Sequence, residues 1–461
     1  MYYQTRSLAA PDVIDPRLTE LYRYNPEHYP FILASTAKGT NCQFDILLAH
    51  PQQALAVHPR ALSSQQAGFL DKLQSWWQRE KIEVAVSAST AAANSLPFTG
   101  GWFIYLSYEL AAEIEPVLTL PAADHDDPVA WAVRCPCAVI FDHDRRQHIA
   151  VAEREFSGLL DVIEQDFSRA LTARRPNATA ATDVQVADVA EADEGPYLEQ
   201  VARIKRYIFD GDIFQANLSR RWQVTIASET TDITLFDRLA QANPGCFAVL
   251  ASLPHSTVIS SSPERLIRVK HGVIETRPIA GTRPRSEDAA VDGRLADELM
   301  AHPKERAEHI MLIDLERNDL GRLCVPGTVE VNELMVRESY QHVHHIVSNI
   351  RGGLRDNVSP ADVIRAVFPG GTITGCPKVR CMEILAEMEQ EARGAYTGSI
   401  GYINRDGSMD LNILIRTLQR QGETIVFRAG GGIVADSDAR HELAETRAKA
   451  RGLLRALGVG G

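Results

Sequence analysis

The order of apolar and polar positions along the chain predicts a mixture of strands and helices. Short apolar runs bounded by turn residues predict strands, and they lie at 44–49, 100–106, 131–142, 147–153, 214–225, 247–253, 257–260, 328–337, 344–350 and 424–429. Two further stretches predict hairpins, 265–276 turning at Lys270-His-Gly and 398–419 turning at Arg405-Asp-Gly-Ser. Apolar residues at helical spacing predict helices at 65–79, 156–171, 197–209, 286–301, 304–317, 378–389 and 439–457.

This pattern predicts the fold class and a division of the chain. Strands outnumber helices and many neighbouring strands are hairpin-linked, which favours an α+β protein with large, mostly antiparallel sheets flanked by helices. Residues 172–195 are rich in Ala, Thr, Asp and Val, a composition that predicts a linker. We therefore expect an N-terminal α/β region at 1–171 and a second domain at 196–461. A long surface loop within one domain is the alternative.

Composition and charge exclude several classes of function. The 461 residues are 45% apolar and carry a formal net charge of −12, which argues against a nucleic-acid partner or an acidic membrane surface. The first residues lack the apolar core of a signal peptide and no run is long enough to span a membrane, so a cytoplasmic protein is expected. Seven cysteines are present without the paired CxxC spacing of a zinc site, and reduced thiols are the simplest interpretation.

The stretch from Pro369 to Glu383 combines backbone freedom with a helix start. Gly370, Gly371 and Gly375 permit close approach to the main chain, and Pro377 suits the first position of a helix. Open N–H groups at a helix start can bind an anion. An ordinary loop entering a helix is the alternative, and the spacing is not that of a P-loop.

Two predicted helices each carry a pair of glutamates three residues apart. Glu305 and Glu308 form one pair, and Glu442 and Glu445 form the other. This spacing places both carboxylates of a pair on one helix face, and two such faces together would suit a hard cation such as Mg²⁺. Glutamate pairs on solvated helix faces are the commoner case.

Three further residues stand out by their surroundings. Arg416 lies in an apolar run predicted as a strand, where a guanidinium needs an anionic partner: a bound carboxylate or an internal salt bridge. His345 is either a core histidine or a proton donor. Lys449 follows Glu445 by one helical turn and could pair with it or contact substrate.

Taken together, the motifs resemble the chorismate-utilising enzymes, the family that includes the large chains of anthranilate, aminodeoxychorismate and isochorismate synthases. The matching segments span most of 196–461 in order and start at Asp212-Ile-Phe-Gln, Ser262-Pro-Glu-Arg, Arg277-Pro-Ile-Ala-Gly-Thr, Asp314-Leu-Glu-Arg-Asn-Asp, His345-Ile-Val-Ser-Asn, Pro369-Gly-Gly-Thr, Ile415-Arg-Thr and Ala429-Gly-Gly-Gly. Two N-terminal segments, at 26–35 and 100–110, match more loosely. The resemblance implies a sandwich-like fold and a chorismate-binding catalytic domain at 196–461.

The same resemblance assigns roles to individual residues. It implies that Mg²⁺ is held by Glu308 and Glu445, supported by Glu305 and Glu442. The implied substrate-binding residues are Gly281, Thr372, Tyr396, Arg416, Gly431, Gly432 and Lys449. Thr282 is implied to line the pocket and to belong to the catalytic residues with Glu264, His345 and Gln215. Either Glu264 or His345 would protonate the departing 4-hydroxyl group, because expelling hydroxide needs an acid.

Residue 215 bears on the product. The relatives that form isochorismate or salicylate carry a lysine there to activate water, whereas this chain has Gln215. Glutamine cannot take a proton and ammonia needs no base, so we expect an amine as the product.

Two amine-forming activities remain open. The Pro369 stretch, Gly398-Ser-Ile-Gly-Tyr, Phe44-Asp-Ile-Leu and the segment at 100–110 resemble aminodeoxychorismate synthase component I, which serves folate biosynthesis, and we favour it. Ala280 is typical of anthranilate synthase, because the lysine-type aminodeoxychorismate synthases carry a nucleophilic lysine there. Anthranilate synthase component I is therefore the alternative.

Partners also follow from the resemblance. No glutaminase nucleophile loop occurs in the sequence, so we expect ammonia from a separate glutamine amidotransferase subunit. The N-terminal half is expected to hold a tryptophan pocket; its Leu-Leu-Glu-Ser element reads Ile32-Leu-Ala-Ser here, which argues against feedback inhibition and leaves structural tryptophan open. A non-catalytic subunit that binds chorismate or tryptophan is a remote alternative.

Overall fold

The computed structural model describes residues 2–9, 18–37, 39, 42–59, 68–83, 96–123, 126–173, 183–340 and 343–460. Two large sheets form its centre, and every strand pairing recorded in these ranges is antiparallel. This confirms the predicted α+β class with large antiparallel sheets.

The first sheet has twelve strands. In spatial order they are β1 (Tyr3–Leu8), β8 (Gln147–Glu153), β7 (Cys137–Asp142), β3 (Phe44–Ala49), β2 (Phe31–Ala34), β11 (Phe247–Ser252), β12 (Thr257–Ser262), β21 (Thr417–Gln421), β22 (Thr424–Ile433), β10 (Gln215–Ile226) and β18 (Gly375–Cys376), with β9 (Val186–Glu191) paired to β10.

The second sheet has ten strands. In spatial order they are β15 (Ile279–Pro284), β17 (Val343–Gly353), β14 (Val273–Thr276), β13 (Arg265–Lys270), β20 (Met409–Asn412), β19 (Ser399–Asn404), β5 (Gly101–Leu106), β6 (Ala130–Cys135) and β4 (Ala54–Val57), with β16 (Glu330–Ser339) paired to β17. Both sheets therefore combine strands from before and after residues 172–195.

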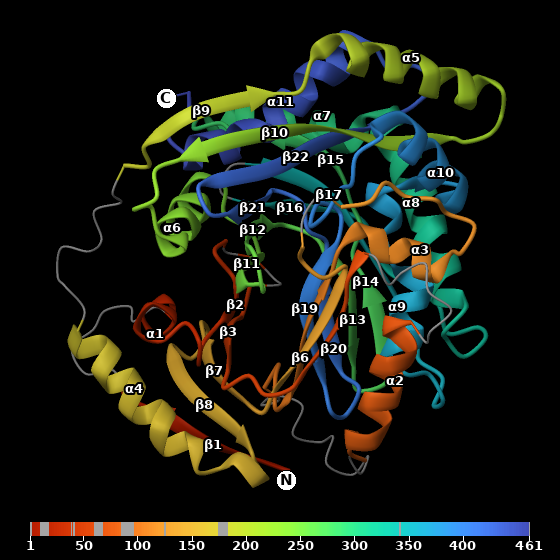
Figure 1. The fold of residues 1–461 in the computed structure, drawn as a ribbon. Helices are drawn as coiled ribbons and strands as arrows, with labels where there is room; N and C mark the ends of the chain where they lie inside the picture. Colours follow the sequence, from red (N-terminus) through yellow and green to blue (C-terminus); the bar gives the residue numbers. More distant parts are fainter. Residues whose placement is uncertain are drawn as a thin grey trace.

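Helices cover the outer faces of the two sheets (Figure 1). They are α1 (Thr19–Tyr24), α2 (Phe69–Glu80), α3 (Ala111–Ile114), α4 (Leu159–Ala173), α5 (Glu194–Phe209), α6 (Asp232–Ala242), α7 (Ala289–Ala301), α8 (Pro303–Gly321), α9 (Pro360–Val367), α10 (Lys378–Glu389) and α11 (Ala439–Ala456). None of the helices in the described ranges is both long and apolar enough to cross a membrane.

Three apolar layers follow from this arrangement. One lies between the sheets, where Phe31 of β2 stacks on Phe103 of β5 at 3.8 Å between ring centroids. A second packs α1, α4, α6 and α11 on the twelve-stranded sheet. The third packs α2, α8 and α9 on the ten-stranded sheet. Burial of both sheet faces explains why many strands appear in the sequence as continuous apolar runs.

Two predicted strands are each divided between the sheets. The run at 131–142 forms β6 in one sheet and β7 in the other, with Pro136 between them; proline has no N–H for a ladder. The run at 410–419 divides into β20 and β21, and Arg416 lies in the break with a φ of 52°. The prediction that Arg416 sits within a strand is wrong.

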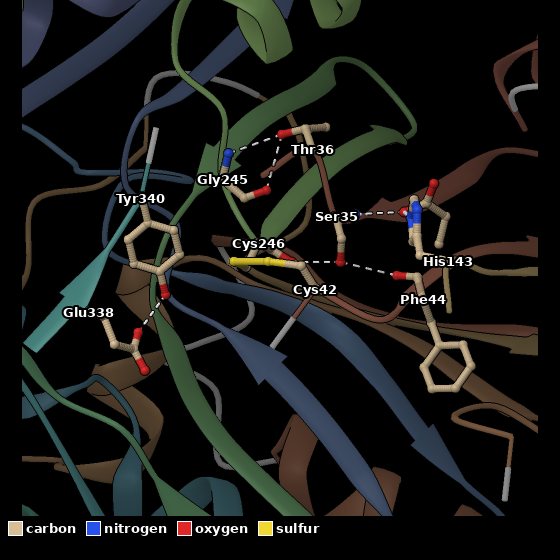
Figure 2. The surroundings of a disulfide bond; sticks show 10 residues. Ser35, Thr36, Cys42, Phe44, His143, Gly245, Cys246, Glu338 and Tyr340 are labelled. Atoms are coloured by element: carbon tan, nitrogen blue, oxygen red, sulfur yellow. Dashed lines mark hydrogen bonds and ion pairs between the residues drawn. A yellow bond between two sulfur atoms is a disulfide. The ribbon is translucent and has the colours of Figure 1, made fainter. Parts of the chain in front are cut away.

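The expectation of reduced thiols is wrong for two of the seven cysteines. Cys42 and Cys246 are 204 residues apart in sequence and form a disulfide. Pairing of β2 with β11 brings their loops together, and Thr36 and Gly245 exchange hydrogen bonds of 3.0 Å beside the bridge (Figure 2). Sequence separation concealed this pairing.

Smaller differences concern element ends. The predicted linker at 172–195 contains the end of α4, β9 and the start of α5. Pro377 is the residue before α10 and not its first helical residue. The small-residue stretch at 85–96, which predicts a loop, lies, except for Leu96, outside the described residues.

Candidate active site

The carboxyl of Glu264 and the guanidinium of Arg416 lie near each other at the junction of the two sheets, where the charge of Arg416 acts on Glu264. Glu264 directly precedes β13, is 6% exposed, and accepts a hydrogen bond of 2.7 Å from the Thr372 hydroxyl. Burial raises the pKa of the Glu264 carboxyl from its ordinary 4.5 to about 7, against the Thr372 hydrogen bond and the charge of Arg416. The Arg416 guanidinium donates at 3.1 Å to the Asn243 side-chain oxygen. Glu264 is thus a carboxyl that keeps its proton into the neutral range.

His345 of β17 faces the same pair from the ten-stranded sheet. Its Nδ1 lies 2.9 Å from the Thr282 hydroxyl and 3.3 Å from the Gly281 carbonyl oxygen. A carbonyl oxygen only accepts, so Nδ1 carries the proton and Nε2 keeps its lone pair. Burial, with the charge of Arg416, lowers the pKa of His345 to about 4. This histidine is neutral near pH 7.

The Gly430–Gly432 segment of β22 presents open backbone to the site. Among the described strands, β21 pairs with β22 only over residues 424–427 of β22. The glycine segment of β22 lies past the last of these pairs and is not paired to β21. A Cβ at Gly432 would lie 2.2 Å from the Gln215 side-chain nitrogen, and one at Gly430 would lie 2.8 Å from the Tyr396 hydroxyl. The absence of side chains lets Gln215 and Tyr396 approach the strand.

Two glutamates of α11 reach the same glycines. A Cβ at Gly431 would lie 3.4 Å from a carboxylate oxygen of Glu442 and 3.5 Å from one of Glu445. Lys449 donates to the Gly430 carbonyl at 3.0 Å and pairs with Glu445 at 2.8 Å. The charge of Lys449 also acts on Glu264. The predicted ion pair of Lys449 with Glu445 is therefore present, and contact of Lys449 with substrate stays a prediction.

The glutamates of α8 lie beside β15. A Cβ at Gly281 would lie 2.9 Å from a carboxylate oxygen of Glu305, and Arg283 donates to the other oxygen at 3.2 Å. Glu308, also on α8, is half-buried. Within the described ranges, no group of three or more His, Cys, Asp or Glu side chains is gathered tightly enough to form a metal site. The four-glutamate Mg²⁺ site stays a prediction.

Two asparagines of the site were not predicted from the sequence. Asn243 follows α6 and holds Arg416, whereas Asn217 of β10 places its side-chain oxygen 2.8 Å from the Cβ position of Gly430. A signal for Asn217 exists, because it stands two residues after Gln215 and so shares its strand face. Asn243 gives no such signal, since it meets Arg416 only through the fold.

A separate cavity of about 900 Å³ opens between the sheets. Residues from the N-terminal segments and from β11, β13 and β19 line it, including Ala34, Ser35, Phe44, Phe247 and Tyr402. The Ile32-Leu-Ala-Ser element thus contributes its last three residues to a cavity wall.

Comparisons with known proteins agree with this geometry. The profile of the family described as chorismate binding enzyme matches residues 30–455. The chain belongs to this family.

The individual relatives carry two names. The chain is 42% identical to an anthranilate synthase component I-like protein of Synechocystis sp. over 78% of this chain and 73% of that protein. It is 40% identical to aminodeoxychorismate synthase component 1 of Bacillus subtilis over 78% and 77%. It is 36% identical to that of Klebsiella aerogenes over 91% and 92%.

Solved structures agree on the fold. The structure of anthranilate synthase component I from Streptococcus pneumoniae superposes with a TM-score of 0.78 at 27% identity, covering 90% of this chain and 93% of that one. The menaquinone-specific isochorismate synthase of Escherichia coli superposes with a TM-score of 0.73 at 16% identity, covering 99% and 94%. The predicted fold is confirmed.

The raised pKa of Glu264 predicts a pH-dependent stability effect of Glu264→Gln. The folded chain keeps this proton up to about pH 7, whereas the unfolded chain loses it near 4.5. The stability that the proton provides is therefore present below pH 4.5 and is lost as the pH rises to 7. Relative to the native chain, Glu264→Gln gains roughly 3 kcal/mol in free energy of unfolding between pH 4 and pH 8.

Denaturant unfolding of both chains at the two pH values measures this difference. Glu389→Gln is the matched control. Burial alone would raise the pKa of Glu389, but the charges of Arg393 and Arg428 outweigh burial and lower this pKa. The ionised Glu389 therefore stabilises the native chain as the pH rises, and the Gln variant loses stability relative to it. A pH-independent difference for Glu264→Gln would contradict the assignment.

Proposed function

We propose that this chain is component I of an aminodeoxychorismate synthase, which converts chorismate and ammonia to 4-amino-4-deoxychorismate and water. Ammonia comes from a separate glutamine amidotransferase subunit. The observation that carries the amine-forming part is Gln215, which lies against the Gly432 backbone. An amide cannot remove a proton from water, whereas ammonia attacks without a base.

The acid–base roles divide between Glu264 and His345. Glu264 keeps a proton near pH 7 and His345 does not, so Glu264 gives its proton to the departing 4-hydroxyl group. The C–O bond breaks and the hydroxyl leaves as water while a C–N bond forms on the ring. The added nitrogen then gives up one proton, which balances the proton that Glu264 donated. Arg416 holds the enolpyruvyl carboxylate together with Tyr396 and the Gly431–Gly432 backbone.

Magnesium belongs to this proposal as the cofactor. Carboxylate oxygens of Glu442 and Glu445 face the Gly431 backbone, where there is no side chain, and oxygen donors of this kind suit Mg²⁺. Glu308 and Glu445 would hold the ion, supported by Glu305 and Glu442. Bound there, Mg²⁺ would supply positive charge for the ring carboxylate.

Regiochemistry separates this proposal from its alternative. The likeness to the Klebsiella aerogenes aminodeoxychorismate synthase extends over 91% of this chain and supports amination at C4. Ala280 of β15 favours anthranilate synthase component I, which forms anthranilate and pyruvate from chorismate. A methyl group is no nucleophile, so with a 4-amino product ammonia must attack the ring directly.

A product assay decides between the two activities. The purified chain receives chorismate, Mg²⁺ and an ammonium salt, and half of each reaction then receives an aminodeoxychorismate lyase. We expect 4-aminobenzoate only in the lyase-treated half and no amine when glutamine replaces ammonium. Anthranilate in both halves would establish the alternative. Glu264→Gln serves as the inactive control, and absence of any amine from the native chain would contradict both.

We also propose that the cavity between the sheets takes tryptophan as a structural ligand. Ala34 stands where the regulatory element has a glutamate, so no carboxylate at that position can bind the tryptophan amine and transmit inhibition. Millimolar tryptophan should raise the melting temperature and leave the rate of amine formation unchanged. Inhibition at that concentration, or an unchanged melting temperature, would contradict this assignment.

A further inference from the structure

Two side-chain amides on one face of β10 have unused acceptor oxygens. Gln215 and Asn217 are two residues apart and so project to the same face of the strand. The Gln215 Oε1 and Asn217 Oδ1 atoms are buried, and neither has a hydrogen-bond partner in the part of the chain that the structure describes. Gln215 as a whole is 8% exposed.

The opposite strand carries no side chains where these two amides lie. β22 pairs with β10 in the register Asn217 to Gly432 and Leu218 to Gly431. A Cβ at Gly432 would meet the Gln215 amide at 2.2 Å, and a Cβ at Gly430 would meet Asn217 Oδ1 at 2.8 Å. Glycine at both positions therefore lets the two amides lie directly against the β22 backbone.

Unpaired acceptors of this kind are costly. A buried polar group without a partner costs about 1–3 kcal/mol, and native structures retain few of them without a reason. The Cα atoms of Gln215 and Asn217 are about 6.6 Å apart along the strand. A small donor that lies between the two side-chain amides can therefore reach both.

The chemistry of the two acceptors limits what they bind. Both are neutral, so they accept hydrogen bonds without removing a proton. Arg416 and Lys449 already supply positive charge to the site, which disfavours a further cation such as ammonium. A neutral molecule with several N–H groups matches best. Ammonia has three N–H donors and one lone pair, so two donors can be held while the lone pair faces the ring.

We propose that Gln215 and Asn217 together form the seat of the attacking ammonia, with Asn217 as a second nucleophile-positioning residue. The inference rests on the proposed amine-forming function. It deepens that function, because it assigns the selection of ammonia to a pair of amide acceptors and not to Gln215 alone. It holds for attack at C2 or C4 of the ring.

Steady-state kinetics with ammonium as the nitrogen source test the seat. Asn217→Leu keeps the approximate side-chain size and removes the acceptor. At saturating chorismate and fixed pH, we expect the KM for ammonium to rise at least tenfold, while the KM for chorismate changes less than twofold. Gln215→Met removes the other acceptor and should raise the ammonium KM in the same way, so the test survives if one variant fails to fold.

Two further variants separate positioning from a structural effect. Asn349→Ala removes a buried side-chain amide of β17 that donates at 2.8 Å to the side-chain oxygen of Asn332 on β16. The ammonium KM of this variant should equal that of the native chain. Asn217→Asp keeps acceptor oxygens and should hold the ammonium KM within threefold of the native value. An unchanged ammonium KM in folded Asn217→Leu and Gln215→Met would overturn the inference. Absence of amine from the native chain would instead overturn the proposed function.

Discussion

The Arg416 guanidinium lies where the chain passes from the ten-stranded sheet to the twelve-stranded one, and the site is arranged around it. Removing this charge from water costs several kcal/mol unless other groups solvate it. The end of α6 supplies the Asn243 oxygen, and Glu264 supplies a nearby carboxyl. Ser261 of β12 binds the Arg416 carbonyl at 3.1 Å, which helps to hold the residue at its positive φ.

Glu264 and His345 respond in opposite ways to this environment. Burial favours the neutral form of both groups, and the charge of Arg416 further opposes a proton on His345. The result is a protonated carboxyl opposite a neutral imidazole at neutral pH. Burial therefore divides the acid role from the accepting role, whereas the charge of Arg416 lowers the pKa of both groups.

Prediction from the sequence succeeds where a single local signal decides the structure. An apolar run predicts the range of β3, and helical spacing predicts the range of α10. The turn motif at Lys270-His-Gly predicts the hairpin of β13 and β14. The run at 131–142 misleads because both of its halves are buried, and only Pro136 marks the change of sheet. Arg416 misleads for a related reason, since a crossing between sheets resembles one apolar strand.

Site residues divide in the same way. Motifs identify Glu264, His345, Gln215 and the glycines of β22 as candidates. Glu264 and His345 both lie within reach of the Arg416 charge, and Gln215 lies against Gly432. Asn243 and the Cys42–Cys246 bridge depend on pairings between distant segments, such as β2 with β11. No local pattern carries that information, because each partner is ordinary in its own stretch of sequence.

We propose that Arg416 anchors a carboxylate of chorismate beside Glu264. The most direct test is the dissociation constant of chorismate, measured by calorimetry with Glu264→Gln as an unreactive background. Adding Arg416→Gln should weaken chorismate binding at least 100-fold. The control is Arg420→Gln, four residues further along the chain, which breaks an ion pair with Asp232 of α6. Adding this substitution should leave chorismate binding unchanged. Equal affinities for the single variant and the Arg416 double variant would contradict this role of Arg416.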